Sequence, residues 1–221
     1  IKIHKRSYGI VVAGIILSLL TLYPRVFIQY LPEEQQFDFL FNYRIGLLGL
    51  IAHQLIASFF FRNIIKSNWS KTINLILITV FLTLFASISF VLFYIFLNQF
   101  ETLNLKSISF NHYIVIQIFL ISAISFIHVL VVRSKKSVSF YKNHLTFYFA
   151  FYVFSFLLFK FFQLNIIYLS IIHIIAMLSY LYLSCNFLVR IIPSKKILYL
   201  KKIFDLISLI ILFLAIFNLF L

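Results

Sequence analysis

Apolar residues run through the chain in long stretches separated by short polar segments. The stretch from Ile73 to Leu97 shows no alternation of apolar and polar positions, whereas a transmembrane barrel strand alternates over about 10 residues. A bilayer core about 30 Å thick needs about 20 apolar residues per helical crossing, with backbone polar groups paired inside each segment. The pattern predicts an all-α fold, a polytopic transmembrane helical bundle of about seven spans in a single domain over residues 1–221. We expect the spans at residues 8–30, 45–62, 73–98, 109–132, 144–164, 166–190 and 203–221.

Charged residues fall unequally on the two sides of these spans. The side opposite the N-terminus has few positive residues. Its charged residues are Glu33, Glu34, Asp38, Arg44, Glu101 and Lys106. The N-terminal side holds fifteen positive residues and one negative residue: Lys2, Lys5, Arg6, Arg62, Lys66, Lys71, Arg133, Lys135, Lys136, Lys142, Arg190, Lys195, Lys196, Lys201, Lys202 and Asp205. Positive residues in short loops are retained on the cytoplasmic side, or by extension the matrix side of an organelle. This predicts an inside N-terminus and an outside C-terminus.

Composition narrows the class of partner. A net charge of +14 and a pI near 9.9 invite a nucleic-acid interpretation, but the basic residues form short loop clusters and no groove-tracking stripe. We expect no nucleic-acid partner, and expect anionic headgroups, cardiolipin among them, at the basic loops. The chain begins with Ile and contains 30 Phe but only 4 Gly. An A+T-rich organelle genome would account for this composition, and an alternative initiation codon would account for the first residue. The other explanation for the first residue is a trimmed chain.

Lys160 is the charged residue that most needs an explanation. It lies in F-Y-V-F-S-F-L-L-F-K-F-F-Q-L, with no acidic residue nearby in the sequence. A lysine inside a span is costly and usually faces a bundle interior or a water-filled path, where it is suited to gain and release protons. Gln163 and Asn165 follow closely, so the alternative is a lysine near a helix end that reaches the interface.

Other chemical signals are sparse. His128 and His173 lie in predicted spans, where they either ligate a haem between two helices or form buried hydrogen bonds; with few glycines nearby, we expect hydrogen bonds. The single Cys185 excludes an intramolecular disulfide and a multi-cysteine metal site. H-E-x-x-H, a Gly-rich phosphate loop and G-x-S-x-G are all missing. We therefore expect no cofactor, no metal and no catalytic residue.

Pro24 interrupts the first predicted span, in L-T-L-Y-P-R-V-F-I. Inside a helix it would remove one backbone bond and kink the chain, and broken helices at membrane depth often mark ion paths. The alternative is that Tyr23 ends the helix and Arg25 begins the interface.

Two segments resemble a known family. S-F-L-L-F-K-F-F-Q-L-N-I-I-Y-L around Lys160, followed by L-S-Y-L-Y-L-S-C-N-F-L-V-R ending at Arg190, resembles the C-terminal part of subunit 2 of NADH–ubiquinone oxidoreductase. That subunit is one of the antiporter-like subunits of respiratory complex I. A second segment, R-I-G-L-L-G-L-I-A-H from Arg44 to His53, is similar to another stretch of the family. The family's glycine–proline break before the lysine is replaced here by F-Y-V-F-S-F.

The resemblance implies a role and a location. Lys160 would be a protonatable station on a hydrated path, with His173, His53 and Arg44 along it. The chain would be a truncated or split, non-redox subunit of a proton-translocating NADH:ubiquinone oxidoreductase, among other membrane subunits of a large complex. It would cross the mitochondrial inner membrane, with its N-terminus on the matrix side and its C-terminus on the intermembrane side.

Two other functions remain open from the sequence. The first is an accessory or structural helical subunit of a mitochondrial membrane assembly, a respiratory complex or ATP synthase, without a site of its own. Low glycine content and abundant bulky aromatic residues fit such a scaffold. The second is a free-standing bacterial seven-span sensor or transporter, although a substrate transporter should carry more polar residues inside several spans than this chain does.

Overall fold

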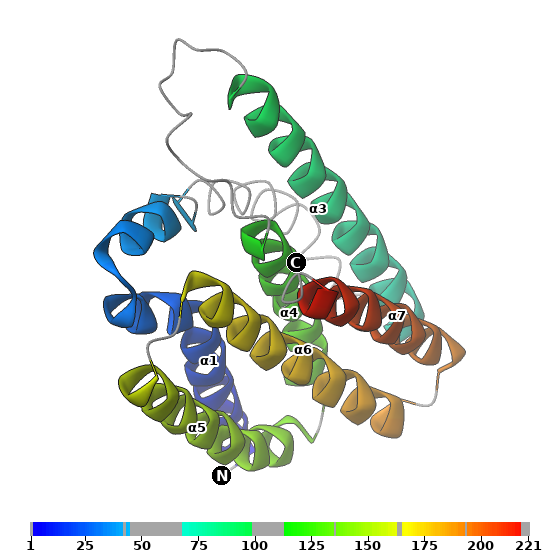
Figure 1. Cartoon of the computed structure of the whole chain (residues 1–221). Coiled ribbons are helices and arrows are strands. Elements are labelled where there is room, and N and C mark those ends of the chain that lie inside the picture. The colour runs from blue at the N-terminus through cyan, green and yellow to red at the C-terminus, as the bar shows by residue number, and fades with distance from the viewer. Residues whose placement is uncertain are drawn as a thin grey trace.

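The computed structural model is all-helical over the residues that it describes, which are 2–41, 43–44, 68–98, 113–134, 136–162, 165–192 and 194–217 (Figure 1). The fold class predicted from the sequence is therefore confirmed at the level of an all-α fold. The named elements are α1 (Lys2–Phe27), the 3-10 helix η1 (Ile28–Tyr30), α3 (Trp69–Asn98), α4 (Tyr113–Arg133), α5 (Ser137–Phe161), α6 (Ile166–Ile191) and α7 (Lys195–Phe217).

These helices overlap the predicted spans, and the three largest differences are at N-terminal ends. The helix α1 begins six residues before the span expected at 8–30, α5 seven residues before that expected at 144–164, and α7 eight residues before that expected at 203–221. All three extensions contain lysines, because a helix need not stop where its sequence becomes polar. The span expected at 45–62 lies outside the described residues.

The segment expected to be a loop, residues 31–44, is mostly helical. Residues 33–41 form a short helix directly after Pro32. Proline is favoured at a helix start, and the acidic side chains of Glu33 and Glu34 in the first turn are favourable beside the unpaired N–H groups there. These local start signals account for a short helix in a segment that connects two expected spans.

Contacts between side chains give the relative directions of α1, α5 and α6. The hydroxyl of Tyr152 donates to the Leu19 carbonyl (2.9 Å), and the rings of Phe27 and Phe159 stack with centroids 5.3 Å apart, so α1 and α5 run the same way. On α6, by contrast, Tyr180 lies beside Tyr148 and Phe187 beside Phe140, with centroids 5.9 and 4.6 Å apart. α6 is therefore antiparallel to both α1 and α5.

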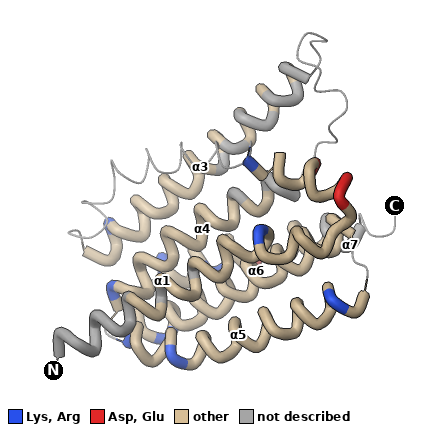
Figure 2. The backbone as a smooth tube through the Cα atoms, turned by 90° about the vertical axis from the view of Figure 1, so that its left-hand side faces the viewer, with Lys and Arg blue, Asp and Glu red and all other residues tan. Residues whose placement is uncertain are grey.

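Contacts at one end of the bundle connect three polar segments. The Arg133 guanidinium, in the last turn of α4, donates to the Thr72 hydroxyl (2.7 Å) and lies over the Trp69 ring at the start of α3. At the start of α7, Lys196 donates to the Asn74 side chain (3.2 Å). Figure 2 shows most Lys and Arg positions at one end of the bundle and an acidic segment at the other. We refer to these as the basic end and the acidic end.

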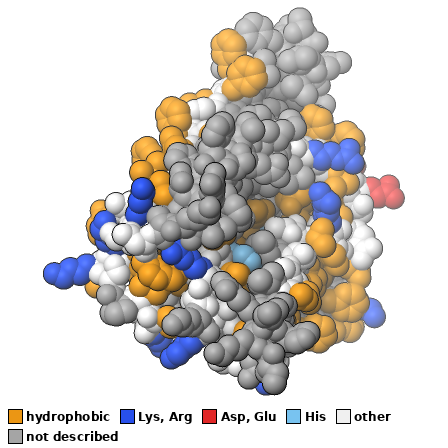
Figure 3. All heavy atoms as spheres, turned by 180° about the vertical axis from the view of Figure 1, so that it is seen from behind, with side chains coloured by type: hydrophobic (Ala, Val, Ile, Leu, Met, Phe, Trp, Pro, Cys, Tyr) orange, Lys and Arg blue, Asp and Glu red, His pale blue; other side chains and the backbone are white. Residues whose placement is uncertain are grey.

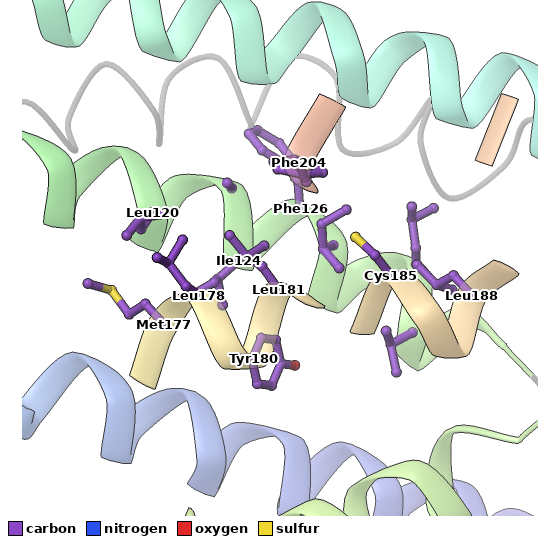
Figure 4. Close-up of a cluster of buried hydrophobic side chains, with 14 of the residues drawn as sticks. Leu120, Ile124, Phe126, Met177, Leu178, Tyr180, Leu181, Cys185, Leu188 and Phe204 are labelled. Atoms are coloured by element: carbon purple, nitrogen blue, oxygen red, sulfur yellow. The ribbon is translucent and has the colours of Figure 1, made fainter. Parts of the chain in front are cut away.

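The core lies mainly between α4 and α6. Leu120 and Ile124 of α4 pack in one cluster with Leu181 and Leu188 of α6 (Figure 4). Phe204 of α7 belongs to the same cluster. All five side chains are buried. α6 is thus the central helix, in contact with α1, α4, α5 and α7.

The outer faces of three helices are apolar. Large side chains are exposed along α3, α5 and α7, including Phe81, Phe85, Leu92, Phe149, Phe154, Phe161, Leu206, Leu209 and Phe213. Apolar side chains lie at the described surface in Figure 3, where the charged ones gather towards its two sides. Within the described residues, two helices are long and apolar enough to cross a membrane, Ser137–Phe161 and Ile166–Ile191. Length and composition are thus consistent with a transmembrane protein.

Candidate functional site

The helix α1 passes through Pro24 and continues to Phe27. The alternative in which Tyr23 ends the helix was therefore wrong. Because proline has no N–H group, the carbonyl of Leu20, four residues earlier, is left without its usual helix donor. In a low-dielectric interior such a carbonyl needs another partner.

Side chains from three other elements donate to carbonyls around this break. His173 Nε2 of α6 lies 2.6 Å from the Leu20 oxygen. The hydroxyl of Tyr152 bonds the Leu19 oxygen at 2.9 Å, and the hydroxyl of Tyr43 bonds the Thr21 oxygen at 3.1 Å. Three consecutive carbonyls thus each accept a side-chain hydrogen bond. We call this set the proline-break cluster; its members are Leu19, Leu20, Thr21, Tyr43, Tyr152 and His173.

His173 is fully enclosed in this cluster. Its ring stacks on that of Tyr23, with centroids 5.2 Å apart and an interplanar angle of 11°. Since Nε2 faces a carbonyl oxygen, we assign the hydrogen to Nε2, which makes Nδ1 an acceptor in the neutral ring. Nδ1 is buried, and within the described part of the chain it has no hydrogen-bond partner. The cluster therefore holds one acceptor without a described partner, His173 Nδ1, beside the position where α1 lacks a backbone hydrogen bond.

A second polar cluster lies nearer the basic end. His128 Nδ1 of α4 is 3.0 Å from the Tyr141 hydroxyl and 3.1 Å from the Tyr180 hydroxyl. Next to it, the hydroxyl of Tyr148 is 3.3 Å from that of Ser179. We call these five residues the histidine–tyrosine cluster. It joins α4, α5 and α6 through side-chain hydrogen bonds alone.

An apolar turn of α6 separates the two clusters. Tyr180 follows His173 by seven residues, which is about 10 Å along a helix axis. Ala176 and Met177 lie between them and are buried. Both clusters can tie helices together, and a relay of protons between them would need water across this turn.

The structure separates the residues expected on a proton path. Lys160 is exposed in the last turn of α5, with its ammonium 5.9 Å from the centroid of the Phe156 ring. Arg44 is also exposed, and His53 lies outside the described residues. Of this set, His173 is the member buried in a polar cluster.

The expectation that Lys160 faces protein is not met among the described residues. Lys160 lies eight residues beyond Tyr152 on α5, about 12 Å along the axis. From the last turn of a helix a lysine can carry its ammonium beyond the apolar surface. The described helices alone therefore do not enclose this side chain.

The histidines form hydrogen bonds, as expected. His128 and His173 belong to different clusters and contact different helices, an arrangement that does not direct them at a common ligand. Within the described residues there is no group of three or more His, Cys, Asp or Glu side chains that could hold a metal ion.

Sequence reasoning missed the tyrosines that complete both clusters. A signal was present on α5, where Tyr141, Tyr148 and Ser155 recur every seven residues and so share one helix face. All three are buried.

Comparison of the chain with protein-family models, curated proteins and solved structures finds no match.

Proposed function

We propose that this chain is a polytopic membrane protein that serves as a subunit of a larger membrane assembly. The observation that carries the proposal is the exposure of large apolar side chains on α3, α5 and α7. Phe85, Phe154 and Phe213 expose 66%, 58% and 68% of their surface, respectively. Contiguous exposed apolar surface of this kind indicates contact with lipid or with another protein.

Helix direction and charge support several crossings. From α3 to α7, successive helices reverse direction, and basic segments meet at one end through Arg133 and Lys196. A bundle of about seven spans with its N-terminus on the positive-inside face accounts for both features. In a mitochondrion that face is the matrix.

The resemblance to the antiporter-like subunit makes a mitochondrial respiratory complex the first assembly to test. In that role, the exposed Lys160 would act as a proton station only where a neighbouring subunit covers it, because a lysine open to lipid is costly. The Lys160 side chain then marks a contact surface as well as a protonatable group.

One observation favours the second candidate, an accessory or structural subunit. Most polar side chains of the two buried clusters form hydrogen bonds between helices. Tyr152 of α5 bonds the Leu19 carbonyl of α1, and Tyr180 of α6 bonds His128 of α4. Interhelical hydrogen bonds of this kind stabilise membrane bundles without any transport role.

Photocrosslinking in native membranes tests the proposal. A photoreactive phenylalanine analogue replaces Phe85, Phe154 or Phe213 in separate variants, and Tyr148, which is buried, serves as the matched control position. We expect the chain to resist alkaline extraction, and at least one exposed position to crosslink to another membrane protein while Tyr148 does not. Release by alkali would overturn the membrane assignment. Crosslinks to lipid alone at all three positions would overturn the subunit assignment, and the identity of a captured protein tests the respiratory complex.

A further inference from the structure

A cleft lined by polar and aromatic side chains opens between α5 and α6 at the basic end. Its volume is about 370 Å³, and its lining includes Ser139, Asn143, His144, Asn186 and Arg190. Phe140 and Phe187 also line it, with ring centroids 4.6 Å apart. None of the lining residues is acidic. Amide, hydroxyl, imidazole and guanidinium groups, contributed by both helices, are of the kinds that bind phosphate and carboxylate oxygens.

His144 is oriented by its own helix. Its Nδ1 lies 2.6 Å from the Phe140 carbonyl oxygen, and its ring stacks on that of Phe140 at 4.1 Å. Since Nδ1 donates to that carbonyl, Nε2 is the nitrogen left to act towards the cleft, and it donates to an anion only in the protonated ring. Arg190 belongs to the last turn of α6 and supplies a permanent positive charge.

A second, apolar groove lies between α6 and α7. Its volume is about 410 Å³, and its lining includes Ile175, Leu178, Leu209 and Leu212. The polar residues that reach it are Ser179, Ser208, Tyr182 and Asp205. Asp205 is bonded to Lys201, and this hydrogen bond raises the pKa of the lysine. Because the two side chains form an ion pair, they add little net charge to the groove.

Tyr182 connects the two hollows, because it lines both of them. Along α6 the walls form one stripe, from Arg190 through Asn186 and Tyr182 to Ile175. The stripe spans sixteen residues, a rise of about 22 Å along the helix axis. Half a bilayer with its headgroup region measures about 20–22 Å. Its polar part is at the basic end, and its apolar part runs from there towards the middle of the bundle.

We propose that this stripe binds one anionic phospholipid, with the phosphate in the α5–α6 cleft and an acyl chain in the α6–α7 groove. The inference rests on the proposed membrane location. Charge selects the ligand: the cleft brings an arginine and a histidine together with two amides and no carboxylate. The groove beside it is of the size and apolar character that hold hydrophobic ligands. Free phosphate can bind in the cleft but has no acyl chain to occupy the groove. A zwitterionic lipid can occupy the groove, but its neutral headgroup is attracted less strongly by Arg190.

Lipid retention in the gas phase tests this on the full-length chain. The protein is extracted from membranes, after alkaline extraction has established insertion, and is analysed by native mass spectrometry with dioleoylphosphatidylglycerol or dioleoylphosphatidylcholine. We expect one tightly held phosphatidylglycerol, with at least tenfold weaker retention of phosphatidylcholine. Arg190→Gln should weaken phosphatidylglycerol retention by about tenfold, the effect of one charge-assisted hydrogen bond. Lys142→Gln is the matched control, because Lys142 is exposed on α5 beside Asn143 but does not line the cleft.

A second pair of variants tests the groove. Ser208→Phe fills it and should displace the acyl chain, whereas Leu206→Phe adds an aromatic ring at an exposed position of α7 outside it. Equal retention of both lipids, or equal loss in Arg190→Gln and Lys142→Gln, would overturn the lipid site. So would unchanged retention in Ser208→Phe. Stabilisation by inorganic phosphate to the same extent as by phosphatidylglycerol would reduce the site to an anion cleft. Each of these results leaves the membrane location intact, which only the alkaline extraction contradicts.

Discussion

His173 donates a hydrogen bond to the carbonyl of Leu20, the oxygen that Pro24 leaves without its helix donor. The imidazole therefore takes over the role of the missing N–H group of residue 24. This explains how a proline is accommodated inside α1, and it fixes α6 against α1 at one level of the bundle.

A double-mutant cycle between His173 and Pro24 tests this relationship. His173→Phe removes the donor and should lower the free energy of unfolding by about 1–3 kcal/mol, the cost of a buried acceptor left unpaired. Pro24→Ala supplies a backbone N–H that can bond the same carbonyl. We expect the double variant to lose less stability than His173→Phe alone, measured by denaturation in detergent. Purely additive effects would show that the two residues do not share this carbonyl.

A second cycle concerns the histidine–tyrosine cluster. Tyr141 and Tyr180 both approach His128 Nδ1, which has one site for a hydrogen bond, and their hydroxyls are 3.5 Å apart. Either hydroxyl can therefore satisfy the imidazole when the other is absent. Tyr141→Phe and Tyr180→Phe should each cost about 1 kcal/mol or less, and the double variant clearly more than their sum.

Tyr182→Phe is the control for this cycle, because Tyr182 is exposed on α6 and belongs to neither cluster. Its substitution should leave the free energy of unfolding within about 0.5 kcal/mol of the original. A single variant as damaging as the double one would mean that one tyrosine alone holds His128.

Helix positions were predictable from the sequence because the apolar stretches are long and recur along the chain. The apolar stretches are about as long as a crossing requires, and α4 and α6 agree with the expected spans to within a few residues. Helix starts in polar sequence were less predictable. Lys195 and Ser137 begin helices well before the apolar residues, and nothing in hydropathy marks those positions.

The candidate site was harder to predict than the fold, since it depends on which helices are neighbours. The sequence offers Pro24 as a break and His173 as a polar residue, but their separation of about 150 positions hides the fact that they meet. Lys160 drew attention by its charge alone. Its exposure in the last turn of α5 follows from where that helix ends, which the polar residues after it indicated only in part.

Topology is testable by labelling of single cysteines on a Cys185→Ala background. Lys142→Cys lies at the basic end and Glu34→Cys at the acidic end, and both positions are exposed. We expect a membrane-impermeant maleimide to label Glu34→Cys from the outer side of sealed vesicles, and Lys142→Cys only after permeabilisation. Labelling of both cysteines from the same side would contradict the alternating arrangement of spans.

Lys160→Ala separates the two candidate functions. Because the side chain is exposed and lies over the neighbouring Phe156 ring, we expect the free energy of unfolding to change by less than about 0.5 kcal/mol. If Lys160 is a proton station covered by a neighbouring subunit, proton transport by the native assembly should fall in Lys160→Ala while assembly is retained. Lys160→Arg should transport poorly as well, since a guanidinium holds its proton. Lys142→Ala removes a lysine from the opposite end of the same helix and should leave transport unchanged. Full transport in Lys160→Ala would exclude the proton-station role and leave the accessory subunit as the function of this chain.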